Sequence, residues 1–94
     1  MLGAPSELKT DTDGLNKIKE HQGLVESHAN KTFSTFEPVG YTTQVVAGTN
    51  YQAVVKVGED EHIHVKIYEP LPGQGDNSVS GFKEGVNAND AFDF

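Results

Sequence analysis

The spacing of apolar residues changes from a helical period to an extended period at Pro38. Before that proline, a stripe with one polar interruption recurs every three or four residues, as on one face of a helix. Its members are Leu15, Ile18, Gln22, Val25, Ala29, Phe33 and Phe36. The stripe predicts one long helix over residues 14–36, with Asp13 as its N-cap and Pro38 forcing its end. Gly14 and Gly23 each weaken such a helix by about 1 kcal/mol relative to alanine, so we expect it to depend on packing against a sheet.

After Pro38 the apolar residues alternate with polar ones, which is typical of strands with one buried face. The runs that alternate are residues 39–45, 51–57 and 63–67, and residues 79–83 look like a fourth strand. Short turns rich in glycine, proline, asparagine and acidic residues separate them. Short turns between consecutive strands predict an antiparallel meander. A short strand near Leu8 adds a fifth candidate. The predicted fold class is therefore α+β, with one long helix packed on an antiparallel four- to five-stranded meander sheet in a single domain, residues 1–94. We expect the helix to cover one face and water the other.

The meander has a geometric consequence for its turns. Alternate turns of a meander lie at the same end of the sheet, so the turn at Gly48 and the turn at Pro72 should be neighbours, with the charged turn at residues 58–61 at the far end. Both neighbouring turns are apolar, with the sequences Val45-Val46-Ala47-Gly48 and Leu71-Pro72-Gly73. Turns normally carry polar residues, and an exposed apolar ridge of this kind indicates a contact site.

Composition narrows the class of partner. The 94 residues carry a net charge of −7, contain no cysteine, and take all seven cations from lysine. A dispersed set of lysines without arginine argues against a nucleic-acid partner. Disulfides and cysteine–zinc sites are excluded, which suits a reducing compartment. We find no secretory signal and no apolar run near the ~20 residues of a membrane span, so we expect a cytoplasmic protein with no membrane contact.

Three short motifs together resemble the stefins, the single-domain cystatins without disulfides. The stefin signature Gln-x-Val-x-Gly stands here as Gln44-Val45-Val46-Ala47-Gly48. A Leu-Pro-Gly motif follows in the later hairpin as Leu71-Pro72-Gly73, and a glycine near the N-terminus stands at Gly3, between Leu2 and Ala4. The three motifs occur in register over the whole chain, on a helix-then-meander plan. The chain is therefore similar to stefins along its full length.

The resemblance implies reversible, non-covalent inhibition of papain-like cysteine proteases such as cathepsins, without a cofactor. It implies that an N-terminal arm and two hairpin turns enter the active-site cleft as a wedge. The residues implied to bind the protease are Leu2, Gly3, Ala4, Gln44, Val45, Val46, Ala47, Gly48, Leu71, Pro72 and Gly73. We also expect a monomer that can form a domain-swapped dimer if the turn at residues 44–50 straightens.

Two alternatives remain from the residues themselves. One is a protein-interaction module that keeps this fold without inhibiting proteases. The other is a metal-binding or catalytic protein that uses His62 and His64, which are two positions apart on one strand face. Zinc sites usually need three or four ligands, so we interpret both as solvated strand histidines, and His21 and His28 as surface residues. No catalytic constellation stands out, and we expect the protein not to be an enzyme.

Overall fold

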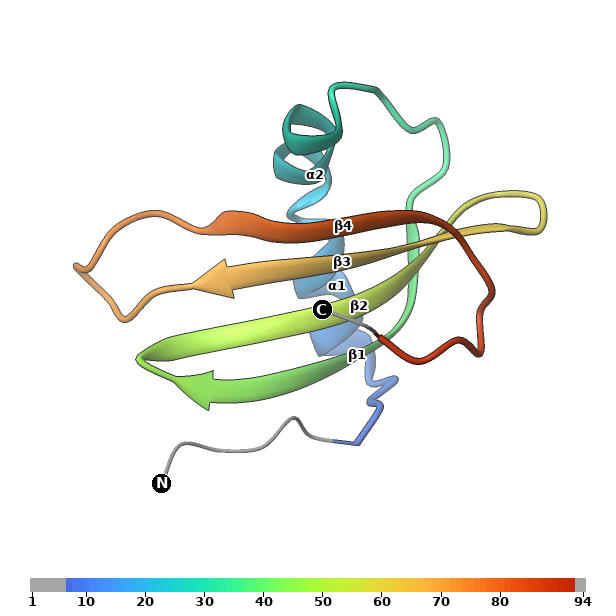
Figure 1. The fold of residues 1–94 in the computed structure, drawn as a ribbon. Coiled ribbons are helices and arrows are strands. Elements are labelled where there is room, and N and C mark those ends of the chain that lie inside the picture. Colours follow the sequence, from blue (N-terminus) through green and yellow to red (C-terminus); the bar gives the residue numbers. More distant parts are fainter. Residues whose placement is uncertain (1–6, 93–94) are drawn as a thin grey trace.

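Two short helices precede a four-stranded sheet in the computed structural model, which describes residues 7–92 (Figure 1). The helices are α1 (Thr12–Lys19) and α2 (Gln22–Ala29), and the strands are β1 (Glu37–Val46), β2 (Gly48–Gly58), β3 (Glu61–Glu69) and β4 (Ser78–Val86). The strands pair antiparallel in the order β1-β2-β3-β4, and both helices lie on one face. This confirms the α+β meander. The expected strand near Leu8 is reduced to one antiparallel bridge between Lys9 and Tyr41.

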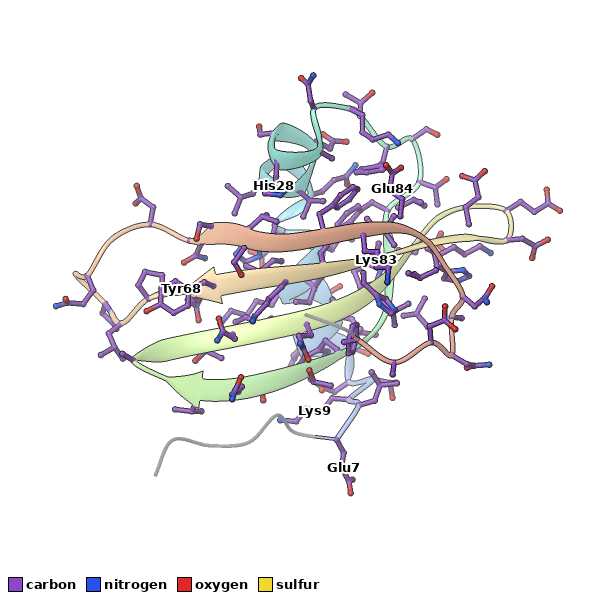
Figure 2. The ribbon with its side chains drawn as sticks, viewed as in Figure 1. Glu7, Lys9, His28, Tyr68, Lys83 and Glu84 are labelled. Carbon is purple, nitrogen blue, oxygen red and sulfur yellow. The ribbon has the colours of Figure 1, made fainter. Side chains whose placement is uncertain are left out.

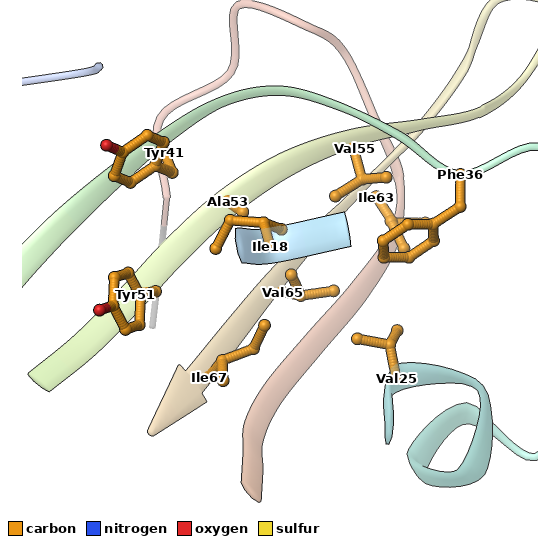
Figure 3. Packing of buried hydrophobic residues seen from close by; sticks show 10 residues of the cluster. All are labelled: Ile18, Val25, Phe36, Tyr41, Tyr51, Ala53, Val55, Ile63, Val65 and Ile67. Atoms are coloured by element: carbon orange, nitrogen blue, oxygen red, sulfur yellow. The ribbon is translucent and has the colours of Figure 1, made fainter. Parts of the chain in front are cut away.

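The core lies between the helices and the inner face of the two central strands. Alternate residues of β2 and β3 point toward the helices, as the sequence period predicts. The buried cluster consists of Ile18, Val25, Phe36, Tyr41, Tyr51, Ala53, Val55, Ile63, Val65 and Ile67 (Figure 3). Burying one aliphatic side chain of this size contributes about 1.5–3 kcal/mol, so these few residues supply most of the apolar driving force.

The prediction of one long helix is wrong because His21 interrupts it. In a continuous helix the Lys17 carbonyl would accept the backbone N–H of His21. Here that N–H donates to the Ile18 carbonyl instead, at 3.0 Å, and the Lys17 carbonyl accepts from Nδ1 of the His21 ring at 2.8 Å. The histidine side chain thus competes with its own backbone, as polar side chains near a helix end can. It is half-buried and bonded, so its interpretation as a plain surface residue is also wrong; His28 is exposed as expected.

The helical layer also ends earlier than the stripe predicts. Asn30 adopts the left-handed conformation, with φ of 57°, which ends α2 after Ala29. Phe33 and Phe36 therefore reach the core from a loop. That loop is held by α2, because Glu26 Oε2 accepts the backbone N–H of Phe33 at 2.8 Å and Gln22 donates to the Phe33 carbonyl at 3.0 Å.

The N-cap of α1 is Asp11 rather than the predicted Asp13. One oxygen of Asp11 accepts the backbone N–H of Gly14 at 2.9 Å, and the other accepts the hydroxyl of Tyr41 at 2.5 Å. A Cβ at Gly14 would lie 1.9 Å from the Tyr41 hydroxyl oxygen. Gly14 therefore makes room for a tyrosine of β1, which explains a residue that is unfavourable for a helix.

The outer face of the sheet is partly buried. His64 is 1% exposed, and its ring lies under that of Phe92, with 4.5 Å between the ring centroids. The interpretation of His64 as a solvated histidine is wrong, because the segment after β4 returns across this face. The aromatic residue that anchors the segment was visible in the sequence, but not the place where it packs.

The two helical glycines give opposite predictions for the same substitution. Helix propensity alone makes both Gly14→Ala and Gly23→Ala stabilising by up to about 1 kcal/mol. We expect this gain only for Gly23→Ala, because a Cβ at that position has nothing within 4 Å. Gly14→Ala should instead destabilise by roughly 1–3 kcal/mol, since it forces Tyr41 out of place. Urea unfolding of the two variants measures the difference, and stabilisation by Gly14→Ala would contradict the packing described here.

The bond between Asp11 and Tyr41 should make stability depend on pH at both extremes. The Tyr41 hydroxyl and then the Gly14 amide hold the pKa of Asp11 below its ordinary value of 3.8. The Asp11 carboxylate, followed by burial, raises the pKa of Tyr41 from 10.0 to about 12. Because folding lowers the carboxyl pKa, ionised Asp11 stabilises the fold at pH values above the ordinary pKa, and this stabilisation is lost as the pH falls. Because folding raises the phenol pKa, protonated Tyr41 stabilises the fold at pH values below the ordinary pKa. This stabilisation is lost as the pH rises from 10.0 toward about 12. The stability difference between wild type and Tyr41→Phe should therefore be largest at neutral pH and shrink toward both limits; a pH-independent difference would exclude this linkage.

Candidate functional site

Two exposed apolar turns lie side by side at one end of the sheet, as the meander predicts (Figure 1). We define tip 1 as residues 44–48, where β1 turns into β2, and tip 2 as residues 71–73, at the start of the loop between β3 and β4. The turn between β2 and β3 lies at the opposite end. Val45 of tip 1 is 63% exposed and Leu71 of tip 2 is 52% exposed. Neither tip contains a charged residue, although the chain carries a net charge of −7.

Tip 1 depends on the glycine at its end. Gly48 has a φ of +121°, which side-chain-bearing residues rarely adopt. A Cβ at this position would lie 2.5 Å from the Glu69 carbonyl oxygen and 2.9 Å from the Pro70 Cα. The backbone of tip 1 thus passes directly against the chain that leads into tip 2. Gly48 therefore provides both the turn and the close approach of the two hairpins.

Tip 2 is a tight turn that contains one proline, Pro72, and follows another, Pro70. The backbone N–H of Gln74 donates to the Leu71 carbonyl at 2.9 Å, and Gly73 has a φ of +83°. Proline at the second position and a glycine with positive φ at the third are typical of a type II turn. Pro70 and Pro72 also restrict the backbone on both sides of Leu71. The exposed leucine is therefore presented on a stiff support.

Both ends of the loop that carries tip 2 are tied to the helical layer. At its start, Glu69 Oε1 bonds to Lys17 Nζ at 3.0 Å and to the Tyr51 hydroxyl at 3.2 Å. The Tyr51 hydroxyl and then Glu69 raise the pKa of Lys17, and Lys17 is the main cause of the lowered pKa of Glu69. At its end, the Asn77 amide donates to Nε2 of His21 at 2.8 Å. The residue that breaks the helix therefore also positions the second hairpin.

Tyr68 is a residue of this end of the sheet that sequence reasoning missed. Its hydroxyl donates a hydrogen bond to the carbonyl oxygen of Ala47, in the turn of tip 1. In the strand pairing Tyr68 lies opposite Asn50, so it is diagonal to Gly48. A large aromatic residue diagonal to a turn glycine was the available signal.

The structure brings together the predicted residues of the two turns. Gln44 pairs with Asn50, Val45 with Thr49 and Val46 with Gly48, while Ala47 is the exposed residue between the strands. Leu71, Pro72 and Gly73 form the exposed turn beside them. The predicted arm residues Leu2, Gly3 and Ala4 lie outside the described residues.

The metal alternative gains no support from the described part of the chain. Within residues 7–92, no three His, Asp or Glu side chains cluster closely enough to hold a metal ion. Over the same residues, no helix combines the length and apolar character needed to cross a membrane.

Comparison with known proteins gives a consistent family. The sequence matches the cystatin domain over residues 3–89. The chain belongs to the cystatin family, in its stefin branch. It is 37% identical to cystatin-A of Homo sapiens over 90 residues, which cover 94% of this chain and 92% of that protein. It is 38% identical to cystatin-B of Pan troglodytes over 73 residues, covering 77% and 74% of the two chains. It is also 43% identical to leukocyte cysteine proteinase inhibitor 1 of Sus scrofa over 61 residues, covering 65% and 56%.

Substitution of two glycines of this stefin distinguishes the cost of backbone strain from the cost of a steric clash. Gly48 and Gly73 both have positive φ, but a Cβ at Gly73 has nothing within 4 Å. Gly73→Ala should therefore cost only the backbone term, about 1–2 kcal/mol. We expect Gly48→Ala to cost more, because the added methyl group meets backbone atoms of Glu69 and Pro70 that cannot rotate away. Chemical unfolding of both variants measures this order, and equal costs would show that the hairpins are not in close contact.

Proposed function

We propose that this stefin is a reversible, non-covalent inhibitor of papain-like cysteine proteases such as cathepsins. The observation that carries the proposal is the pair of exposed, uncharged tips held together at one end of the sheet. Membership of the cystatin family supports it, as does the similarity to the leukocyte cysteine proteinase inhibitor 1 of Sus scrofa. In this proposal Gln44, Val45, Val46, Ala47 and Gly48 fill the protease cleft.

The second tip enters the same cleft in this proposal, through Leu71, Pro72 and Gly73. Binding is favourable when a partner removes exposed apolar side chains from water. The two prolines and the anchored loop ends reduce the conformational entropy that binding would otherwise cost. A protein that binds in this way needs no nucleophile and no cofactor, and it is not an enzyme.

The arm can be related to the tips through the direction of the chain. Lys9 pairs antiparallel with Tyr41, and the Leu8 side chain lies over Gly40, where a Cβ would be 3.1 Å from it. Because β1 runs toward tip 1, the chain at Lys9 runs away from it. The resemblance to stefins supports the further proposal that Leu2, Gly3 and Ala4, which precede this bridge in the sequence, form the third part of the wedge.

The remaining features of the proposal concern location and assembly. We propose a single domain over residues 1–94 that acts in the cytoplasm as a monomer, with cysteine proteases rather than nucleic acid or membranes as partners. The domain-swapped dimer, formed by straightening residues 44–50, stays a prediction. It would lack tip 1 and should therefore not inhibit.

Titration of papain with the purified protein tests the function. Residual hydrolysis of a small peptide substrate should fall in proportion to added protein and return on dilution. Trypsin and thermolysin should keep their activity, and the recovered protein should have its intact mass. Full papain activity at micromolar protein would instead favour an interaction module without inhibition, and a cut within residues 45–48 would indicate a substrate.

A valine pair on β1 tests the part played by tip 1. Val45→Asp should weaken inhibition of papain by at least ~2 kcal/mol, because the carboxylate would lose water without gaining a partner. Val39→Asp makes the same change on the same strand, at a position that is 40% exposed and remote from the tips. We expect that control to inhibit like wild type. Thermal unfolding of both should stay close to wild type, and equal inhibition by the two variants would remove tip 1 from the contact.

A further inference from the structure

We infer that the hydroxyl group of Tyr68 is a positioning group that holds the two tips in one binding arrangement. The inference rests on the proposed function, since it concerns how the tips are presented to a protease. Figure 2 shows Tyr68 at the end of β3, at the same end of the sheet as both tips. Its hydroxyl donates to the Ala47 carbonyl, so a side chain of the strand that leads into tip 2 is bonded to the backbone of tip 1.

The turn of tip 1 needs such a support because the sheet ends before it. The pairing of β2 with β3 stops at Thr49 and Glu69, whereas β1 and β2 continue to Val46 and Gly48. Ala47 lies beyond both pairings. β1 is also an edge strand, and within residues 7–92 its last residues pair with β2 alone. A two-stranded ribbon that projects from a sheet frays easily in water.

Tyr68 can reach the turn only because Gly48 lies between them. A Cβ at Gly48 would be 2.9 Å from the Tyr68 hydroxyl oxygen. The absence of a side chain lets the phenol pass over the glycine to the Ala47 carbonyl, as aromatic residues often cover a cross-strand glycine. The neighbouring residues Glu69 and Pro70 contact Gly48 through their backbone. The two hairpins are thus joined by backbone contact at Gly48 and by a side-chain hydrogen bond at Ala47.

Tyr41 supplies a matched control. The chain has three tyrosines, and each hydroxyl donates a hydrogen bond. Tyr41 bonds to Asp11 at the start of α1, on the helical side of the sheet. Tyr41→Phe therefore deletes the same chemical group without touching either tip. Tyr41 is buried and Tyr68 is only half-buried.

The experiment compares Tyr68→Phe with Tyr41→Phe in the full chain. Three quantities are measured for each: thermal unfolding, amide hydrogen exchange of residues 45–50 in the free protein, and the dissociation rate from papain. Tyr68→Phe should leave unfolding nearly unchanged, raise exchange at tip 1, and speed dissociation about three- to tenfold, the range expected for one hydrogen bond. Tyr41→Phe should lower the unfolding temperature and leave the tip exchange and the dissociation rate unchanged.

The outcomes separate this inference from the function itself. Faster dissociation of Tyr68→Phe with unchanged tip exchange would mean that the hydroxyl contacts the protease directly, which overturns a positioning role. Unchanged tip exchange and unchanged dissociation also overturn it. If wild type does not inhibit papain, the proposed function fails. Hydrogen exchange in the free protein then still decides whether Tyr68 orders tip 1.

Discussion

The inner face of β2 and β3 is the constraint on which the rest of the structure depends. Ala53, Val55, Val65 and Ile67 have no exposed surface, because α1, α2 and the loop that carries Phe33 and Phe36 pack over them. Since side chains alternate along a strand, this requirement fixes the register of both strands and sends their other side chains to the outer face. It also fixes which turns meet. With β2 and β3 antiparallel and adjacent, tip 1 enters β2 at the same end at which β3 leaves for tip 2.

The helical layer does more than cover the core, because it also holds the second hairpin. Lys17 and His21 lie one turn apart and bond to residues at opposite ends of the loop after β3. Surface ion pairs such as Lys17–Glu69 contribute little stability by themselves, about 0–1 kcal/mol. Their effect here is geometric: they fix where the loop starts and ends. The interruption of the helix at His21 is therefore part of the arrangement, because the same ring caps the break and receives Asn77.

The sequence pattern was sufficient for the sheet and insufficient for the helices. Alternation over Tyr51–Val57 and Ile63–Ile67 predicts strands because one face is buried without interruption, and the adjacency of the turns follows from topology alone. The helical stripe continues through Phe33 and Phe36, and it cannot show that those two aromatic residues reach the same core from a loop. The break depends on a competition for the Lys17 carbonyl, and the true N-cap depends on a tyrosine thirty residues away. Such pairings between remote residues leave no periodic signal.

The sequence likewise predicts some residues of the candidate site and not others. Val45 and Leu71 could be identified because apolar residues at turns are out of place in water. The motif includes Gly48, but the structure explains why glycine is needed there: the backbone of Glu69 and Pro70 lies against it. Alternation places Tyr68 on the outer face of the sheet, but it says nothing about diagonal neighbours. The anchors Lys17 and Asn77 belong to this group as well.

The contact between Gly14 and Tyr41 has a consequence for how the sequence can diverge. A tyrosine at position 41 leaves no space for a side chain at position 14, and Asp11 bonds to both residues. The three positions therefore form one unit of substitution. With the tyrosine in this position there is no room for a Cβ at position 14, whereas a smaller residue on β1 would leave space for alanine there. We expect covariation between these two positions, although they are far apart in the chain and both lie outside the two tips.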